Sequence, residues 1–360
     1  MLHAIPSFRG GGAERQLALL ARELATMEVA IDVAYVHPGP NLELLENAEV
    51  RIHRIEAASN YDPRIYLSIR RLISRVQPIC IQTWLPQMDI LGGAAAFASG
   101  IPHVLSERSS VDAYPATVRN VLRRWIGCRA RAVVANSDGG ARYWRNRGAA
   151  SVQVIRNGID FASLEHVDAA DSTLLGIPGD VRIIVYAGRF SPEKNLEVLF
   201  DAFEVLLRDR TDCAALLFGD GELTDAVRSR VASLDCADRV RVMGFTRELP
   251  SWMRRASLFV SPSLFEGNPN SVLEAMAIGC PAVLSDIPQH REIADDASAW
   301  FFEPRSSGQL ADRLLDALSH RELGLQKAYG ARERVRVLSL RHAASLYRNL
   351  YGAIMQGEQS

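Results

Sequence analysis

A regular alternation of short apolar runs with helical segments limits the possible folds of this chain more than any other feature, and it occurs twice. The first series of apolar runs stands at Leu2–Ile5, Val29–Val36, Val50–Ile55, Ile79–Thr83, His103–Ser106, Ala132–Asn136 and Val152–Ile155. The second series stands at Arg182–Ala187, Ala214–Phe218, Val240–Met243, Ser257–Ser261, Ala282–Ser285 and Ala299–Phe302. Strands that alternate with helices predict parallel sheets covered on both faces. We therefore expect an α/β protein with two Rossmann-like, doubly wound domains.

A polar stretch with little periodicity, residues 162–180, follows the first series and ends in Gly-Ile-Pro-Gly, a composition typical of a linker. The 360 residues are enough for two domains of about 100 to 200 residues each. We predict domains at 1–160 and 181–338 with a linker at 161–180. Residues 339–360 include a helical pattern, Leu340–Met355, that no strand follows, and we expect this helix to pack back across the first domain.

The composition is that of an ordinary globular protein, with 48% apolar and 23% charged residues. The net charge of -1 is unevenly distributed along the chain. Residues 1–160 contain 19 Arg, no Lys, 8 Glu and 6 Asp, which gives a balance of +5 and leaves -6 for residues 161–360. The five cysteines are scattered without C-x-x-C or histidines at metal spacing, so neither a disulfide framework nor a metal site is indicated.

Membrane and targeting signals are also missing from the sequence pattern. No leader of charged and then apolar residues opens the chain, and no apolar run approaches the ~18 residues of a transmembrane helix. We expect a cytoplasmic protein that does not span a membrane.

The stretch Phe265–Glu274, with the sequence FEGNPNSVLE, predicts a tight loop that leads directly into a helix beginning near Ser271. The loop follows a buried strand, so it lies at the carboxyl end of a sheet, where backbone N–H groups and the helix dipole favour an anionic ligand. The alternative is that Ser271 and Glu274 form a capping box, S-x-x-E, with no contact to a ligand. Glu266 helps neither the strand nor the helix, which favours a functional role.

A second loop, Gly188–Asn195, begins where the first strand of the second series ends. Its Arg189 and Lys194 can hold a diphosphate, the arginine through a forked contact and the lysine as a point charge. Both could instead be solvated loop charges. Against that reading, Lys194 is one of only two lysines in the chain, the other being Lys327, beside 39 arginines.

The glycine triplet Gly10–Gly12 lies between a short strand and a helix over Ala13–Met27, which makes a phosphate-binding turn possible. It is not the dinucleotide fingerprint G-x-G-x-x-G, because Arg15 occupies the position of the third glycine. This argues against a Rossmann dehydrogenase.

Taken in order, six motifs resemble glycosyltransferase family 4, a large family of retaining enzymes. They are GGGAER at residues 10–15, VIRNGID at 154–160, GRFSPEKN at 188–195, FGDG at 218–221, MGF at 243–245 and FEGNPNSVLEAMA at 265–277. Each motif alone is weak, but their order across nearly the whole chain is specific to the family and not to any one substrate.

The resemblance implies the GT-B architecture, in which two Rossmann-like domains face each other across a cleft and the last helix crosses back to the first domain. The second domain would then bind a nucleotide-sugar, with Arg189 and Lys194 on the diphosphate, Glu266 on the transferred sugar and Glu274 on the ribose. The other donor-binding positions carried over from the motifs are Gly11, Gly12, Asn157, Gly188, Gly219, Gly221, Gly244, Phe245, Asn268, Asn270, Ser271 and Val272.

The chemistry that the resemblance implies is physically coherent. Cleavage of the bond to a nucleoside diphosphate builds negative charge on the leaving phosphate, which preorganised cations stabilise without a metal or another cofactor. Two carboxylates beside a glycosidic bond can also serve hydrolysis, but a hydrolase would leave the Arg/Lys pair without an anion to bind. In the family, retention is attributed to attack on the face from which the leaving group departs.

One segment departs from the family pattern. Many members carry a histidine just after the strand that corresponds to His103–Ser106, near the acceptor, whereas this chain continues with Glu107 and Arg108. These two residues could form a loop ion pair, or they could contact the acceptor.

Val118–Arg131 predicts an amphipathic helix with Val118, Val121, Leu122, Trp125 and Ile126 on one face and Arg119, Arg123 and Arg124 around its edges. The usual arrangement buries the apolar face in the core. The alternative, favoured by the basic balance of this half, is that the helix rests on anionic lipid and meets a lipid-linked acceptor.

The sequence thus favours a cytoplasmic, metal-independent, retaining glycosyltransferase that uses a UDP-linked sugar in building a surface polysaccharide or glycolipid at the inner face of the membrane. The partners that we expect are a nucleotide-sugar, a glycan or lipid-linked acceptor and the membrane surface, and not nucleic acid. A non-catalytic glycosyltransferase-like subunit and a dehydrogenase are the alternatives. The sequence does not identify the sugar, the base, the acceptor, its linkage or the oligomeric state.

Overall fold

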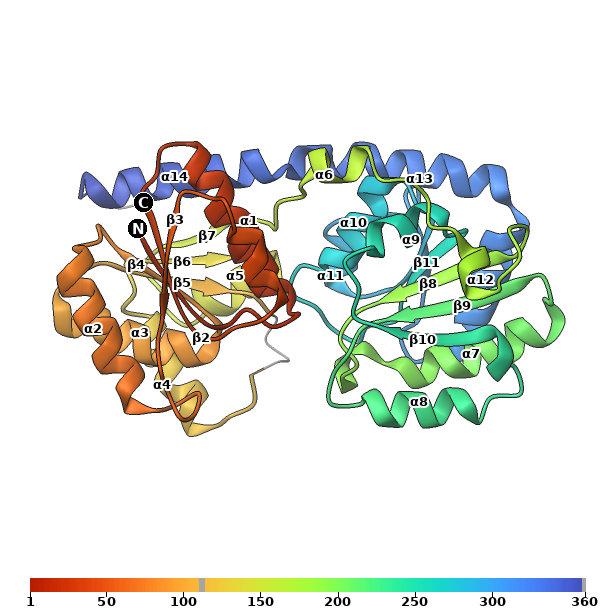
Figure 1. The fold of residues 1–360 in the computed structure, drawn as a ribbon, viewed down its shortest axis with the longest axis horizontal. Coiled ribbons are helices and arrows are strands. Elements are labelled where there is room, and N and C mark those ends of the chain that lie inside the picture. Colours follow the sequence, from red (N-terminus) through yellow and green to blue (C-terminus); the bar gives the residue numbers. More distant parts are fainter. Residues whose placement is uncertain (110–113, 358–360) are drawn as a thin grey trace. The chain divides into compact units, whose positions relative to one another are not determined.

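The computed structural model describes residues 1–109 and 114–357, and it divides into two compact units (Figure 1). The first unit comprises Met1–Gly158 and Leu338–Ser360, and the second comprises Ile159–Val337. Within the described residues no helix is both long and apolar enough to cross a bilayer.

A parallel sheet with the strand order β3-β2-β1-β4-β5-β6-β7 forms the centre of the first unit. Its strands are β1 (Leu2–Ser7), β2 (Ile31–His37), β3 (Val50–Arg54), β4 (Ile81–Trp84), β5 (His103–Glu107), β6 (Ala132–Ala135) and β7 (Val152–Val154). Its helices are α1 (Gly12–Thr26), α2 (Pro63–Val76), α3 (Leu85–Ser99), α4 (Val118–Gly127), α5 (Asp138–Arg145) and α14 (Leu340–Met355), with a 3-10 turn, η1, at Pro40–Leu45.

Helices cover both faces of this sheet, as the alternation predicts. The apolar stripe of α1, with Leu17 and Leu24, packs on one face together with Tyr351 and Ile354 of α14. Residues of α2 and α3 fill the other face, among them Ile69. The C-terminal helix therefore belongs to the core of the first unit although it lies at the far end of the sequence (Figure 1).

The second unit repeats the plan with the strand order β10-β9-β8-β11-β12-β13. Its strands are β8 (Arg182–Ala187), β9 (Cys213–Phe218), β10 (Val240–Gly244), β11 (Leu258–Ser261), β12 (Ala282–Ser285) and β13 (Trp300–Phe302). Its helices are α6 (Phe161–Glu165), α7 (Leu196–Asp209), α8 (Thr224–Ala232), α9 (Leu249–Arg255), α10 (Asn270–Ile278), α11 (Pro288–Arg291), α12 (Ser307–Ser319) and α13 (Arg321–Val335). Short 3-10 turns lie at η3 (Ser172–Leu175), η4 (Pro192–Lys194), η5 (Ala237–Arg239) and η6 (Arg336–Leu338).

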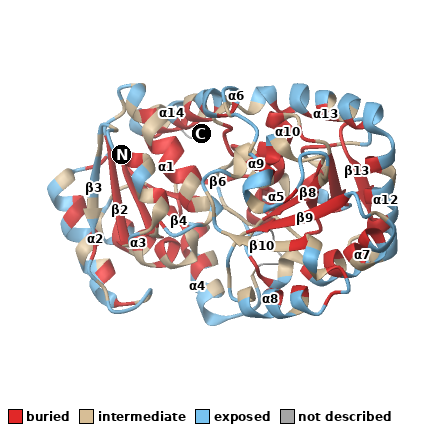
Figure 2. Ribbon diagram, turned by 45° about the vertical axis from the view of Figure 1, so that its right-hand side comes forward, coloured by how far each residue is buried: buried red, intermediate tan, exposed pale blue. Residues whose placement is uncertain are grey.

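The strands of this second sheet are buried along most of their length, as Figure 2 shows for β8 and β9, except for the edge strand β10, which is mostly half-buried. Apolar side chains of α7 and α12, including Phe203 and Leu314, pack with β8, β9 and β11 in one large core. The stretch 161–180 contains α6 and η3 and is hydrogen-bonded to α9, where Arg254 donates to the carbonyl of Leu164 at 2.8 Å and Arg255 to that of Gly179 at 2.8 Å. These residues lie within the second unit.

Candidate functional site

The strand order of the second unit reverses between β8 and β11, which lie side by side although their outgoing connections run to opposite sides of the sheet. In open parallel sheets a crevice forms at the carboxyl ends of such a strand pair, because the two outgoing loops diverge. The loop after β8 carries Arg189 and Lys194, and the loop after β11 carries Glu266. The three residues predicted to contact the diphosphate and the transferred sugar are therefore brought to one edge of the sheet.

Lys194 and Glu266 are in direct contact, with 2.5 Å between the lysine Nζ and the glutamate Oε1. Both side chains are largely withdrawn from solvent, at 17% and 13% exposure. Burial opposes ionisation of Glu266, but the charge and hydrogen bond of Lys194, with a further hydrogen bond from Ser263, hold the pKa of Glu266 below its usual value. The carboxylate is charged at neutral pH as a result.

The loop that carries Lys194 is fixed by its own backbone. After the turn η4, Asn195 adopts a left-handed conformation with φ of 55°. Its side-chain amide donates to the carbonyls of Pro262 and Pro304 at 3.0 and 2.6 Å, and the backbone N–H of Leu264 donates to the carbonyl of Glu193 at 2.8 Å. The residues on both sides of Lys194 are therefore bonded to the loop after β11, which preorganises the ion pair.

A series of buried hydrogen bonds connects Glu266 to His290. Ser263 donates to Oε1 of Glu266 at 2.7 Å, and the carbonyl of Ser263 accepts from Ser285 at 2.6 Å. The carbonyl of Ser285 in turn accepts from Nδ1 of His290 at 2.8 Å. Burial lowers the pKa of His290 against the opposing charge of Glu266. Sequence reasoning did not find His290, because nothing in the local pattern around α11 links it to a loop 24 residues earlier.

Arg189 is exposed in the loop after β8, and the structure records no hydrogen bond or ion pair of its guanidinium within the described residues. Its backbone carbonyl accepts a hydrogen bond from the hydroxyl of Tyr186 at 3.3 Å. The position leaves the guanidinium available to an anionic ligand.

The alternative considered for Ser271 and Glu274, a capping box with Ser271 at the N-cap, does not match the helix start, because α10 begins at Asn270 and its N-cap residue is Pro269. Ser271 is therefore the second helical residue rather than the cap. Glu274 lies more than one turn inside the helix and is only 8% exposed. The remaining donor positions of this motif are the buried Asn268 in the loop and, in the first turn of α10, Asn270, Ser271 and the fully buried Val272.

Two glycines of the predicted donor site are required by close backbone packing, independently of any ligand. A Cβ on Gly219, whose φ is 148°, would lie 1.9 Å from the carbonyl oxygen of Gly188, and one on Gly221 would lie 2.4 Å from that of Phe190. The backbone crosses there too closely for any side chain. Gly244 has a φ of 75°, which favours glycine, and Phe245 beside it is exposed.

In the first unit, the glycine triplet ends at the start of α1, where Gly11 is the N-cap residue and Gly12 the first helical residue. Arg108 follows β5 and stacks over Trp84, with its guanidinium carbon 4.0 Å from the ring centroid. It donates to Asn157 Oδ1 at 3.1 Å and to the hydroxyl of Tyr347 at 2.5 Å. Arg108 and Asn157, predicted separately for the acceptor and the donor, therefore lie in one small pocket against α14.

Glu107 does not pair with Arg108, which corrects the loop ion pair considered above. It ends β5, is fully buried, and its carboxylate lies 3.1 Å from the guanidinium of Arg123. It also accepts hydrogen bonds from Trp144 at 2.9 Å and from Tyr114 at 2.5 Å. Arg123 donates to Asp89 at 2.7 Å as well. The sequence offered one signal that was missed, namely an aspartate inside the apolar helix α3.

The segment Val118–Arg131 also differs from the expectation that its apolar face is buried. Val118, Val121, Leu122 and Trp125 of α4 are all exposed. Arg123, expected at the edge, is one of the most deeply buried side chains, and Ile126 is the one residue of the predicted apolar face that lies in the core.

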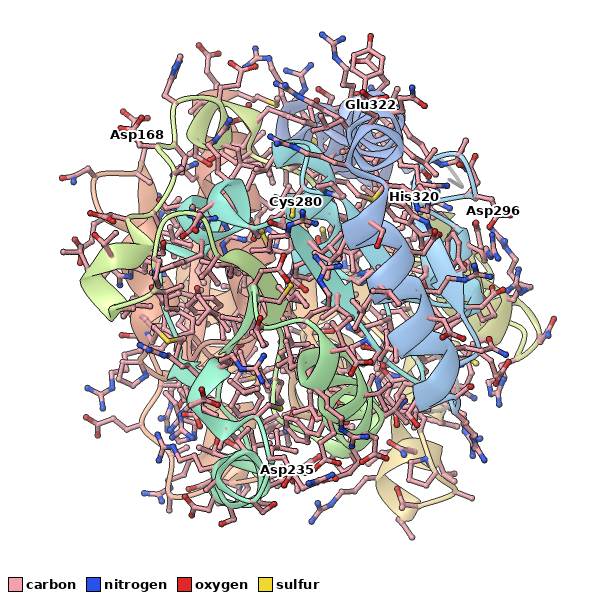
Figure 3. All side chains as sticks on the ribbon, turned by 90° about the vertical axis from the view of Figure 1, so that its right-hand side faces the viewer. Asp168, Asp235, Cys280, Asp296, His320 and Glu322 are labelled. Atoms are coloured by element: carbon pink, nitrogen blue, oxygen red, sulfur yellow. The ribbon has the colours of Figure 1, made fainter. Side chains whose placement is uncertain are left out.

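The cysteines are free thiols. Cys280, labelled in Figure 3, is buried before β12, and burial raises the pKa of its thiol to about 12. A thiolate nucleophile at neutral pH is therefore excluded at this position. In the part of the chain that the structure describes, no group of three or more His, Cys, Asp and Glu side chains could hold a metal ion.

Comparison with protein families gives two matches that together span most of the chain. Residues 169–334 match the profile described as "Glycosyl transferases group 1". Residues 10–163 match the profile described as "Glycosyltransferase Family 4".

Among curated proteins, the chain is 24% identical over 242 residues to an Escherichia coli UDP-Gal:alpha-D-GlcNAc-diphosphoundecaprenol alpha-1,3-galactosyltransferase, covering 63% of this chain and 62% of that protein. It is 25% identical over 304 residues to the putative glycosyltransferase EpsF of Bacillus subtilis, covering 79% of each chain. A lipopolysaccharide core mannosyltransferase of Rhizobium leguminosarum, LpcC, is 26% identical over 53% of this chain and 55% of its own. The chain thus spans less than two thirds of two of these three relatives.

Among solved structures, HepE (Alr3699) of Anabaena in complex with UDP and glucose superposes with a TM-score of 0.86 at 19% identity, over 98% of this chain and 99% of that one. Sucrose-phosphate synthase of Thermosynechococcus elongatus gives 0.82 at 18% identity over the same shares. At this level of identity the likeness concerns the fold.

Proposed function

The chain belongs to the group 1 glycosyl transferases of glycosyltransferase family 4, and from this premise we propose that it transfers a sugar from a nucleoside-diphosphate sugar to a glycan or lipid-linked acceptor, with retention of configuration and without a metal. We assign the donor to the second unit and the acceptor to the first, within the GT-B arrangement. The donor is a UDP-sugar and the product a surface polysaccharide or glycolipid, made at the cytoplasmic face of the membrane.

The contact between Lys194 and Glu266 is the observation that carries this proposal. The bond to be broken joins a sugar to a phosphate, so the residue that orients the sugar and the residue that neutralises the phosphate must lie within a few ångströms of each other. Lys194 and Glu266 come from different loops, 72 residues apart, and meet at 2.5 Å. They do so at the strand pair where ligands of parallel sheets bind.

The reaction requires charge stabilisation more than acid or base groups from the protein. As the glycosidic bond breaks, its electron pair goes to the phosphate oxygen, and the cations of Lys194 and Arg189 stabilise the charge that develops. Retention follows when the acceptor hydroxyl attacks on that same face and gives its proton to the departing phosphate. Glu266, held charged by Lys194, accepts hydrogen bonds from sugar hydroxyls rather than acting as a nucleophile.

The relatives support the donor and acceptor classes. The E. coli relative is named for UDP-galactose and a diphosphoundecaprenol acceptor, and the Rhizobium relative for lipopolysaccharide core. In this reading Glu274 contacts the ribose, Gly11 and Gly12 approach the phosphates, and Arg108 stands on the acceptor side. Glu107 acts only through the position of Arg108, because its carboxylate is already bonded in the core.

The test combines thermal stabilisation with turnover. A panel of UDP-, GDP- and ADP-linked sugars is titrated against the purified protein, because a ligand that binds only the native state raises the melting temperature. We expect stabilisation by a UDP-sugar, its loss in Lys194→Ala, and normal behaviour in Lys327→Ala, which removes the other lysine of the chain.

Each outcome decides between the alternatives. Stabilisation by UDP-sugars with no release of UDP in the presence of membrane lipid and glycan acceptors would favour a non-catalytic subunit. Stabilisation by none of the sugars, or equal loss in both lysine variants, would overturn the proposed donor site.

A further inference from the structure

Helix α4 presents an apolar face to solvent. Val118 is 86% exposed, Val121 51%, Leu122 43% and Trp125 52%. The surface continues onto α3, where Phe97 is 39% exposed and meets Trp125 edge to face with ring centroids 6.5 Å apart. An apolar surface of adjacent side chains, in contrast to scattered single residues, marks an interaction site. We call these five residues the α4 face.

The exposure of the α4 face is imposed by the core beneath it. On the opposite side of the helix Arg123 is only 2% exposed and is paired with Asp89 at 2.7 Å and with Glu107 at 3.1 Å. Turning the helix to bury its valines and tryptophan would remove Arg123 and leave the buried carboxylates of Asp89 and Glu107 without their cation, which is far more costly than exposing apolar groups. The helix therefore holds the face outward in a fixed orientation.

Arginines surround the α4 face. Arg119 stacks on Tyr61 with 4.3 Å to the ring centroid, and Arg129 stacks on Trp125 with 4.1 Å, while Arg124 is half-buried. Helix α3 packs against α4 on one side and against α2 on the other (Figure 1). Helix α2 adds three exposed arginines, Arg70, Arg71 and Arg75.

Carboxylates do not balance this charge. Residues 63–131 contain ten arginines and three carboxylates. Of the three, Asp89 and Glu107 are buried, and Asp112 lies outside the described residues. The described part of this stretch therefore presents arginine guanidinium groups and no exposed carboxylate to a partner.

We propose that the α4 face docks on a bilayer that contains anionic lipid. An aromatic side chain with aliphatic neighbours enters the boundary between head groups and acyl chains, and flanking arginines bind the lipid phosphates. A dissolved polyanion would bind the arginines but would not remove the exposed valine and leucine side chains from water. A second copy of the chain would bring the two sets of arginines together, and like charges across an interface oppose association.

The surface proposal does not depend on the identity of the donor, and its test does not use sugar transfer. Sedimentation with phosphatidylcholine vesicles is compared with vesicles that contain a large share of phosphatidylglycerol, at low and high salt. The Arg119→Gln/Arg124→Gln/Arg129→Gln variant should bind anionic vesicles roughly a hundredfold more weakly, since each basic residue near such a surface contributes about fivefold. Arg123 is left intact because it is part of the core.

Matched controls come from α13, which also has exposed apolar and basic residues. Val121→Ser/Leu122→Ser should lose vesicle binding, whereas Leu325→Ser/Tyr329→Ser should not. Arg321→Gln/Arg332→Gln should bind like the wild type. Far-UV circular dichroism and melting temperature show that each variant is folded.

Trp125 supplies a direct readout of insertion. The other four tryptophans are at most 7% exposed, so Trp125 is the one whose emission responds to a change of surroundings. We expect a blue shift with anionic vesicles and quenching by brominated acyl chains. Trp125→Phe should abolish both signals while the protein still sediments.

Three outcomes would overturn the proposal. The wild type could stay in solution with anionic vesicles at low salt. It could sediment without any change in Trp125 emission, which would place contact elsewhere on the protein. A dimer in sedimentation velocity that is lost in Val121→Ser/Leu122→Ser would assign the α4 face to self-association.

Discussion

Removing the charge of Lys194 separates a structural from a functional role of its ion pair. Lys194→Ala leaves the carboxylate of Glu266, only 13% exposed, without its cation and with the hydrogen bond from Ser263 still in place. Loss of one partner from a fully buried pair costs 3–5 kcal/mol, and partial exposure with the surviving hydrogen bond reduces this here to about 2 kcal/mol. For a unit of this size the melting temperature should fall by roughly 4–8 °C.

The double variant Lys194→Ala/Glu266→Gln is the decisive comparison. It removes the uncompensated charge while glutamine still accepts from Ser263, so we expect it to regain more than half of the lost stability. Turnover should behave differently. Either single variant and the double variant should lose at least ~30-fold in kcat/KM, corresponding to about 2 to 4 kcal/mol of transition-state stabilisation.

The pH dependence of the same variant has a defined sign. In the wild type the pKa of Glu266 is lowered, so its contribution to stability is present at neutral pH and is lost as the pH falls through the folded-state pKa. In Lys194→Ala burial remains without the cation, so the pKa rises and protonation relieves the unpaired charge. The stability difference between wild type and variant should therefore shrink from pH 7.5 to pH 5, measured by denaturant unfolding.

The assays are run at 20 °C, well below either melting temperature, with Lys327→Ala as the matched variant. If Lys194→Ala turned over at a near-normal rate, or if the double variant recovered turnover together with stability, the ion pair would be structural and the proposed diphosphate contact wrong.

Four further predictions concern other parts of the chain. Glu274→Gln should lower nucleotide affinity in calorimetry with little change in melting temperature, and equal loss in both would return Glu274 to a structural role. Excess chelator should leave the initial rate unchanged, whereas full metal dependence would rule out charge stabilisation by the cations alone. His3 and His103 are buried with pKa values lowered to about 3 by burial. Because the unfolded chain binds these protons near pH 6.5, these two groups should lower stability by about 4 kcal/mol from pH 7 to pH 5. Asp89, whose pKa burial raises to about 6, opposes part of this loss, and a net rise in stability over this range would contradict the burial of both histidines as neutral rings. Gly219→Ala should cost about 3 kcal/mol or more, because its Cβ would meet a backbone carbonyl at 1.9 Å at a φ of 148°, while Gly308→Ala, with open space around it, should be nearly neutral.

Much of the fold follows from the sequence because it depends on local periodicity. The apolar runs from Arg182 to Ala187 and from Ala282 to Ser285 match β8 and β12 at both ends. Once two parallel sheets are expected, residues that follow a strand must lie at its carboxyl edge. This is why Arg189, Lys194 and Glu266 could be placed at one edge of the second sheet from the sequence, although the contact between two of them required the structure.

Tertiary structure decided the features that depend on partners distant in the sequence. The period of α4 predicts a buried apolar face. Arg123, however, pairs with Asp89, 34 residues earlier, and this pairing directs the arginine side of the helix to the core and the apolar side to solvent. Glu107 likewise pairs away from its neighbour Arg108, with residues of α4 and α5. Hydrophobic periodicity sets which residues can form a helix, whereas the high cost of an unpaired buried charge sets which side of that helix faces the core. The sequence by itself therefore determined the two sheets and the loops at their edges, and only the packed structure decided that α4 exposes its apolar side chains to solvent.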